Sequence, residues 1–146
     1  MKSKIIIQHV DIVETEEDIG PPDFEVKLTF HSLQEWLLSI CIAERPQKAT
    51  AIISMGVFES TDERILFLIG INRYGNHNEI HNKIEFTPQS TYFLLPKEYY
   101  NGLTRDQLNE KLAKQLSDFT KTQEFQHSLL SESNCIQLNG KEIWTK

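Results

Sequence analysis

The stretch that decides the fold is ATAIISMGVFESTDERILFLIGIN, residues 49–72. It contains two apolar runs, 49–58 and 64–72, which are separated by the polar segment ESTDE. Apolar runs of this length, bounded by turn residues, are typical of buried β-strands. Because a short connection joins antiparallel neighbours, we expect this stretch to form an antiparallel hairpin at the centre of a sheet.

Helices are predicted before and after this hairpin. Two capping-box patterns, each a hydroxyl residue followed three positions later by Glu or Gln, precede apolar residues at helical spacing. They predict helices at 33–43 and 105–120. A shorter apolar stripe predicts a third helix at 122–133.

Further strands are predicted on both sides of the central hairpin. The run 4–13 is rich in β-branched residues, and 24–30 alternates between apolar and polar residues. Two shorter runs, 83–88 and 91–96, follow the hairpin. The chain ends with CIQLNGKEIW, in which Asn139-Gly140 is a strong signal for a type I′ turn between two strands.

The order of these elements indicates the fold class. Strands and helices do not alternate regularly, as they would in a parallel βαβ fold. The length of 146 residues fits a single domain covering 1–146. We therefore expect an α+β fold in which an antiparallel sheet carries its helices mainly on one face.

The net charge and the lengths of the apolar stretches argue against some classes of function. The chain has 15 basic and 21 acidic residues, a net charge of −6. Proteins that bind nucleic acids or anionic membranes need the opposite sign of charge. No stretch is long enough for a membrane span or for the apolar core of a signal peptide. We expect a cytoplasmic protein without a nucleic-acid or membrane partner.

Known catalytic motifs are not found in the sequence. There is no Walker A loop, no G-x-G-x-x-G pattern and no G-x-S-x-G motif. Cys41 and Cys135 are too few for a disulfide framework, and neither lies in a catalytic cysteine signature. The sequence therefore predicts no cofactor and no catalytic residue.

The stretch NRYGNHNEIHNK, residues 72–83, is the candidate metal site. Two histidines four apart converge on one metal only if a helix holds them, and the glycine and asparagines here favour a turn. The H-x-E-x-H spacing also differs from that of zinc proteases. We interpret the stretch as a solvated connecting loop. A small metal-dependent enzyme using His77, Glu79 and His81 is the alternative.

Acidic residues gather in two places, the stretch 11–25 and the segment ESTDE. Such charge can steer a basic partner and speed its association, although it can also serve only solubility. The adjacent tyrosines in PKEYYNG can be buried, or they can be exposed aromatic contacts. The residues predicted to bind a partner are Glu14, Glu16, Glu17, Asp18, Glu59, Asp62, Glu63, Tyr99 and Tyr100.

The last third of the chain resembles immunity proteins of bacterial polymorphic toxin and contact-dependent growth inhibition systems. The resemblance lies in LPKEYYNGLTRDQLNEKLAKQLSDFTKTQEFQHSLLSESNCIQLNGKEIW, in the order of its features. A Tyr-Tyr-Asn-Gly turn precedes a long amphipathic helix, an F-x-x-S-L-L-S segment and an Asn-Gly-Lys-Glu-Ile-Trp strand. The resemblance implies a cytoplasmic, non-catalytic protein that binds and neutralises a cognate toxin domain.

The resemblance also suggests how a partner would be recognised. Many such toxins are nucleases with basic faces, which an acidic inhibitor can occupy. A self-assembling structural module, in which sheet edges pair between copies, is a further alternative. The oligomeric state is not predicted.

Overall fold

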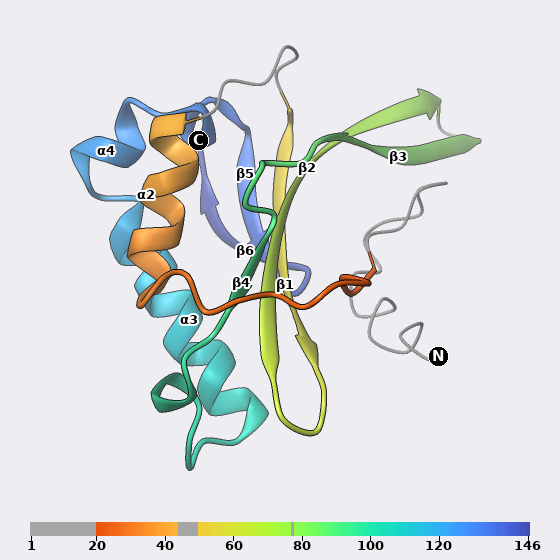
Figure 1. The fold of residues 1–146 in the computed structure, drawn as a ribbon. Helices are drawn as coiled ribbons and strands as arrows, with labels where there is room; N and C mark the ends of the chain where they lie inside the picture. Colours follow the sequence, from red (N-terminus) through yellow and green to blue (C-terminus); the bar gives the residue numbers. More distant parts are fainter. Residues whose placement is uncertain (1–19, 44–49, 77) are drawn as a thin grey trace.

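The structure, a computed structural model, describes residues 20–43, 50–76 and 78–146 (Figure 1). In these ranges the elements, in chain order, are α2 (Leu33–Ala43), β1 (Ile52–Glu59), β2 (Arg64–Asn76), β3 (Glu79–Phe86), β4 (Tyr92–Leu94), η2 (Lys97–Tyr99), α3 (Arg105–Phe119), α4 (Gln123–Gln126), η3 (Leu129–Glu132), β5 (Cys135–Leu138) and β6 (Lys141–Thr145).

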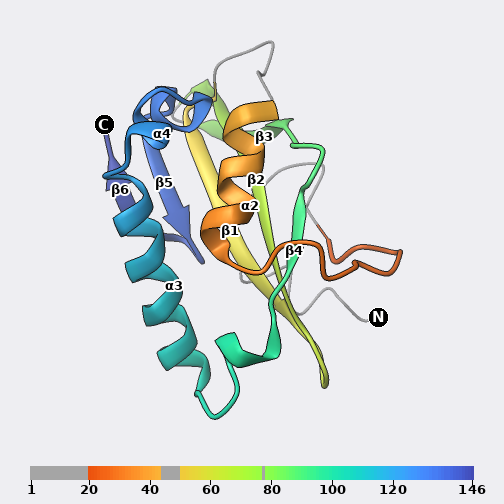
Figure 2. The same ribbon diagram turned by 60° about the vertical axis from the view of Figure 1, so that its left-hand side comes forward.

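The strands form one sheet with the order β3-β2-β1-β5-β6, and β4 pairs with β2 beside β3. Helices α2, α3 and α4 lie together on one face of this sheet (Figures 1 and 2). The α+β prediction, with the helices mainly on one face, is therefore confirmed. The sheet is mostly antiparallel. The exception is β5, which pairs with β1 in the parallel direction.

The central hairpin has the predicted form. β1 and β2 pair in an antiparallel register that runs from Ile52 opposite Ile71 to Glu59 opposite Arg64. A tight turn closes it, in which the Ser60 amide donates to the Glu63 carbonyl at 3.0 Å. Alternate residues of β2 enter opposite faces of the sheet, so its apolar run is buried on both sides.

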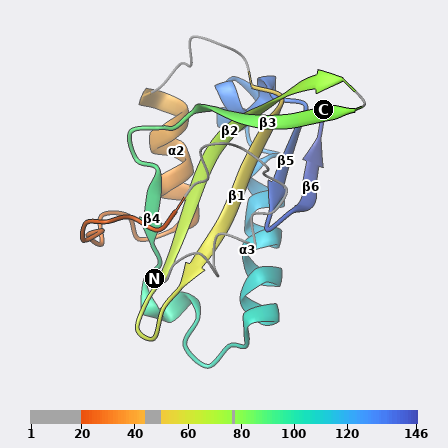
Figure 3. The same cartoon turned by 90° about the vertical axis from the view of Figure 1, so that its right-hand side faces the viewer.

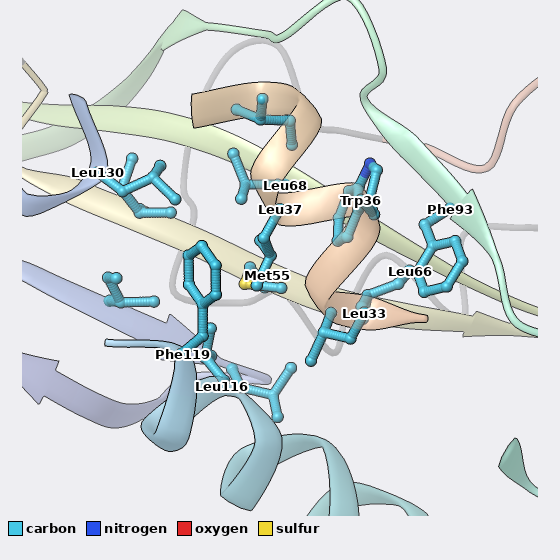
Figure 4. Close-up of a cluster of buried hydrophobic side chains, with 14 of the residues drawn as sticks. Leu33, Trp36, Leu37, Met55, Leu66, Leu68, Phe93, Leu116, Phe119 and Leu130 are labelled. Carbon is cyan, nitrogen blue, oxygen red and sulfur yellow. The ribbon is translucent and has the colours of Figure 1, made fainter. Parts of the chain in front are cut away.

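The main core lies between the sheet and the helices (Figure 4). Trp36 and Leu37 of α2, Leu68 of β2 and Leu116 of α3 are almost completely buried in it. The Trp36 ring stacks on Phe93 of β4 with centroids 5.4 Å apart, and its indole N–H donates to the Ser90 carbonyl at 2.7 Å. These contacts fix α2 over the edge formed by β4.

A second, smaller cluster lies on the opposite face of the sheet. Figure 3 shows this face, which the helices do not cover, toward the viewer. Phe58, Phe67, Ile69 and Ile71 are its buried members. The rings of Phe58 and Phe67 stack with centroids 5.0 Å apart. The central strands are thus apolar on both faces.

Helix α3 begins with the predicted capping box. The Thr104 hydroxyl accepts a hydrogen bond from the Gln107 amide, and the Gln107 side chain accepts one from the Thr104 amide. At the start of α2 only half of the predicted box is present. The Ser32 hydroxyl accepts from the Glu35 amide, whereas the Glu35 carboxylate accepts from the His31 amide.

The C-terminal hairpin confirms the Asn-Gly prediction. Asn139 has a φ of 51° and Gly140 a φ of 82°, as a type I′ turn requires. The turn joins β5 and β6, which pair antiparallel with a bulge between Ile136 and Gln137.

One predicted strand and one predicted helix are wrong. Residues 24–30 are not part of the sheet, and Phe24 and Leu28 are exposed. The helix predicted at 122–133 is divided into α4 and η3, because the Ser128 side chain both donates to the Phe125 carbonyl and accepts from the Leu130 amide. The strand predicted at 4–13 lies outside the described residues.

The stretch 72–83 is a hairpin, and its interpretation as a connecting loop is therefore corrected. β2 continues to Asn76, and β3 begins at Glu79. Gly75 has a φ of 103°, and the Asn76 side chain accepts a hydrogen bond from the Asn78 amide at 2.9 Å. Gly75, Asn76 and Asn78, which indicated a loop, therefore lie near the end of this hairpin, and the hairpin extends beyond the rest of the sheet (Figure 3).

Candidate functional site

A cavity of about 380 Å³ lies at the end of the molecule where the β1–β2 turn approaches the start of α3 (Figure 1). Strand residues Glu59 and Arg64 form one wall. Tyr100 and Leu103, from the segment that leads into α3, form the other. The cavity is open to solvent, and two of the residues predicted to bind a partner, Glu59 and Tyr100, line it.

Glu59 is the central charge of this cavity. Its carboxylate accepts two hydrogen bonds from the Arg105 guanidinium, one from Nη2 at 2.8 Å and one from Nε at 3.1 Å. A carboxylate and a guanidinium match well in this two-bond geometry. The hydrogen bond to Glu59 raises the pKa of Arg105 above its ordinary value. Glu59 therefore anchors α3 to β1 as well as contributing charge.

Arg64 connects the turn to the tyrosine segment. Its Nη1 donates to the carbonyls of Ser60 and Glu63 at 2.9 and 3.0 Å, and its Nε lies 3.8 Å from the Glu59 carboxylate. The guanidinium also lies 5.1 Å from the centre of the Tyr100 ring. A cation in this position is attracted by the face of an aromatic ring.

Asp62 and Glu63 are exposed in the turn. The Tyr100 hydroxyl donates to the Asp62 carbonyl at 3.3 Å, so Tyr100 lies against the same turn. Two carboxylates, of Glu59 and Asp106, and two guanidinium groups, of Arg64 and Arg105, line the cavity, and the exposed Asp62 and Glu63 carboxylates lie in the adjoining turn. The surface at this end is therefore acidic overall and includes a half-buried aromatic ring.

The residues predicted to bind a partner do not all lie in one place. It brings Glu59, Asp62, Glu63 and Tyr100 together at one end of the molecule. Tyr99 is buried, and its hydroxyl accepts a hydrogen bond from the Leu33 amide at 2.7 Å, so Tyr99 is a core residue. The predicted acidic residues Glu14, Glu16, Glu17 and Asp18 lie outside the described residues.

Sequence reasoning missed three residues of this surface. Arg64 and Arg105 organise the Glu59 carboxylate, and Leu103 is 39% exposed beside them. Each arginine directly follows a feature that the sequence did indicate, the ESTDE turn and the Thr104 cap. Their positions next to these two features are the only signal in the sequence that could have indicated Arg64 and Arg105.

Two of the three candidate metal residues, Glu79 and His81, lie on β3. Glu79 and His81 are exposed on β3, and the His81 ring lies 6.3 Å from that of Tyr74 across the ladder. His77 lies outside the described residues. Within the described ranges, no group of three or more His, Cys, Asp or Glu side chains is arranged to hold a metal ion.

Cys41 and Cys135 are both buried and are not joined in a disulfide. Burial raises the pKa of the Cys135 thiol, and the nearby Glu142 raises it further. A raised pKa disfavours the reactive thiolate form. The environment of Cys135 is therefore that of a packed side chain.

Comparison of the chain with protein-family models, curated proteins and solved structures found no match. In the ranges that the structure describes, no helix has the length and apolar character needed to cross a membrane. Function is therefore inferred from side-chain geometry, charge and the resemblance of the C-terminal third.

Proposed function

We propose that this protein is an immunity-type inhibitor that binds a cognate bacterial toxin domain and neutralises it. The binding surface, which we call the acidic end surface, consists of Glu59, Asp62, Glu63, Tyr100 and Leu103. The observation that carries the proposal is that the turn with the exposed Asp62 and Glu63 carboxylates lies against Tyr100, which lines a cavity together with the exposed Leu103. The resemblance of the C-terminal third supports the same function.

The chemistry of this surface suits a basic protein partner. Exposed carboxylates accelerate encounter with a basic face, and their effect is strongest at low salt. Tyr100 and Leu103 supply apolar contact area, and aromatic residues are frequent at the energetic centre of interfaces. A nuclease toxin, whose active face attracts phosphates, is the partner class that fits this charge best.

Side-chain contacts join the parts of this surface before any partner binds. The Glu59–Arg105 pair joins β1 to α3, and Arg64 joins the turn to Tyr100. A surface that is already ordered loses less conformational entropy on binding. Inhibition by occupation of a partner's surface also needs no catalytic group, so the protein acts as a cytoplasmic binding protein and not as an enzyme.

Complex formation between purified proteins tests this proposal. The partner is the C-terminal domain encoded by the reading frame just upstream, prepared with its activity blocked by mutation. Size-exclusion chromatography with light scattering should show a stoichiometric complex. If the two proteins elute separately at micromolar concentration and low salt, the proposal is wrong.

A further inference from the structure

The sheet face opposite α2, α3 and α4, which we call the helix-free face, is buried although none of these helices covers it (Figure 3). Phe67, Ile69 and Ile71 of β2 lie on this face, and each has 0% of its surface exposed. A side chain on a bare sheet face keeps its outer side open to water. Complete burial of these three side chains therefore needs a further layer of chain above them.

The buried area extends across the sheet to β5. Ile53 and Met55 of β1 belong to the main core, so Ser54 between them points to the helix-free face, where it is only 1% exposed. Gln137 of β5 is the register partner of Ser54, and its side-chain Oε1 is inaccessible to solvent. The missing layer therefore reaches over β2, β1 and β5, which together span about 10 Å.

The described chain begins at the rim of the helix-free face. The Tyr92 hydroxyl donates to the Gly20 carbonyl at 3.0 Å, and the Phe24 ring lies edge-on to the Tyr92 ring with centroids 6.0 Å apart. Tyr92 itself packs against the buried cluster of this face. Gly20 is the first residue that the structure describes. Residues 1–19 therefore join the described chain beside the face that needs a cover.

The stretch 4–13, KIIIQHVDIV, is long enough to provide this cover. An extended chain advances about 3.3 Å per residue, so this stretch can reach over roughly 30 Å. Residues 14–19 connect it to Gly20 and can span roughly 20 Å. Both lengths exceed the width of the three strands.

The stretch also has the composition of a segment with one buried side. Alternate residues of an extended chain point in opposite directions. Ile6, Val10 and Ile12 share one side, whereas His9 and Asp11 lie on the other. Burial of the apolar side against a sheet face removes it from water and leaves the two ionisable side chains exposed.

We propose that residues 4–13 lie over the helix-free face, with Ile6, Val10 and Ile12 against the side chains of β1 and β2. Pairing of this stretch with the outer edge of β3 is the other possible arrangement, but it would leave Ile69 and Ser54 open to water. The inference goes beyond the proposed function and does not depend on it. It places the sheet between two layers and holds the acidic run 14–18 between the cover and Gly20.

Methyl NMR of the full chain tests this contact directly. The isoleucine and valine methyl groups are ¹³C-labelled in a deuterated protein, and nuclear Overhauser cross-peaks are recorded. Ile69 and Ile71 should show cross-peaks to at least one of Ile6, Val10 and Ile12. The cross-peak between Ile71 and its register partner Ile84 is the internal control. If the control is seen and the cross-peaks to the N-terminal stretch are not, the inference is wrong.

A matched pair of variants tests which side of the stretch is buried. Ile12→Asn should lower the folding equilibrium constant, measured by urea unfolding, at least about tenfold, because it puts a polar group without a partner into a buried position. His9→Asn puts the same side chain on the opposite side of the stretch and should change this constant less than about threefold. Equal effects of the two variants would contradict the proposed orientation.

A second copy of the chain is the alternative source of the cover. In a mixture of ¹³C-labelled and unlabelled chains, isotope-filtered spectra show only cross-peaks between copies. The inference predicts none between Ile12 and Ile69 in these spectra, and their appearance would overturn it. Formation or failure of the toxin complex is measured separately, so failure of this inference can be told apart from failure of the proposed function.

Discussion

The Arg105 guanidinium donates two hydrogen bonds to the Glu59 carboxylate, at 2.8 and 3.1 Å, and so connects the start of α3 to the end of β1. The two residues are 46 positions apart in the sequence. Their pairing places the capped end of α3 beside the β1–β2 turn and gives the acidic end surface its shape.

Replacing Arg105 should affect stability only slightly. The Arg105 side chain is 63% exposed, and exposed ion pairs contribute about 0.2–1 kcal/mol. Arg105→Ala should therefore lower the free energy of unfolding in urea by less than about 1 kcal/mol at low salt. The loss should shrink further at high salt, because salt screens exposed charges. A double-mutant cycle with Glu59→Ala isolates the pair, and an unchanged coupling energy at high salt would contradict this reading.

The two adjacent tyrosines should respond differently to loss of the hydroxyl. Tyr99→Phe leaves the buried Leu33 amide without its acceptor at 2.7 Å, so it should cost roughly 1–3 kcal/mol of unfolding free energy. Tyr100→Phe removes a longer, exposed bond to the Asp62 carbonyl and should cost less than about 0.5 kcal/mol. Urea unfolding of both variants measures the difference. Equal losses would show that Tyr99 has been placed wrongly.

Replacing a core leucine and a surface leucine by alanine should change the free energy of unfolding by different amounts. Leu116 is 1% exposed in the main core, so Leu116→Ala should lower the unfolding free energy by about 2–5 kcal/mol. Leu103 is 39% exposed at the acidic end surface, so Leu103→Ala should stay within about 0.5 kcal/mol of wild type. The same Leu103 variant should weaken toxin binding. Comparable unfolding curves for the two variants would argue against this assignment of the core.

Charge reversal at the turn should act mainly on the rate of association. The double variant Asp62→Lys and Glu63→Lys should bind the toxin domain more slowly and with a weaker dependence on salt, because the steering charge is gone. Stopped-flow measurements at several salt concentrations show this. Glu124→Lys with Glu132→Lys is the matched control, since it changes the net charge equally on exposed residues far from the turn. If both double variants behave alike, only net charge matters and the acidic end surface has no special role.

Local signals predicted the parts of the fold that depend on local chemistry. Thr104 and Gln107 predicted the start of α3, and Asn139-Gly140 predicted the final hairpin. Both predictions were possible because a helix cap or a tight turn depends mainly on the residues that form it. The apolar runs of β1 and β2 were equally clear.

Other parts depend on what packs nearby, which a local pattern does not contain. Residues 24–30 alternate like a strand, yet a strand also needs a neighbour for its backbone hydrogen bonds. The parallel pairing of Cys135 with Ile52 joins segments that are far apart in sequence. Ser128 interrupted a helical pattern because its side chain competes for backbone hydrogen bonds.

The candidate site was predicted in part for the same reasons. Charge and turn composition pointed to Asp62 and Glu63, which do lie exposed together. The role of Arg105 was not visible, because its partner Glu59 is distant in sequence. Tyr99 and Tyr100 are indistinguishable by composition, and only packing places one in the core and the other at the surface.

Protection of growing cells tests the central claim most directly. The C-terminal domain encoded by the reading frame just upstream is expressed from an inducible promoter, alone or together with this protein, and growth is recorded. The account predicts that the domain alone stops growth and that co-expression of the wild-type protein restores it. A domain that is harmless alone, or that stops growth equally in the presence of this protein, would contradict the account.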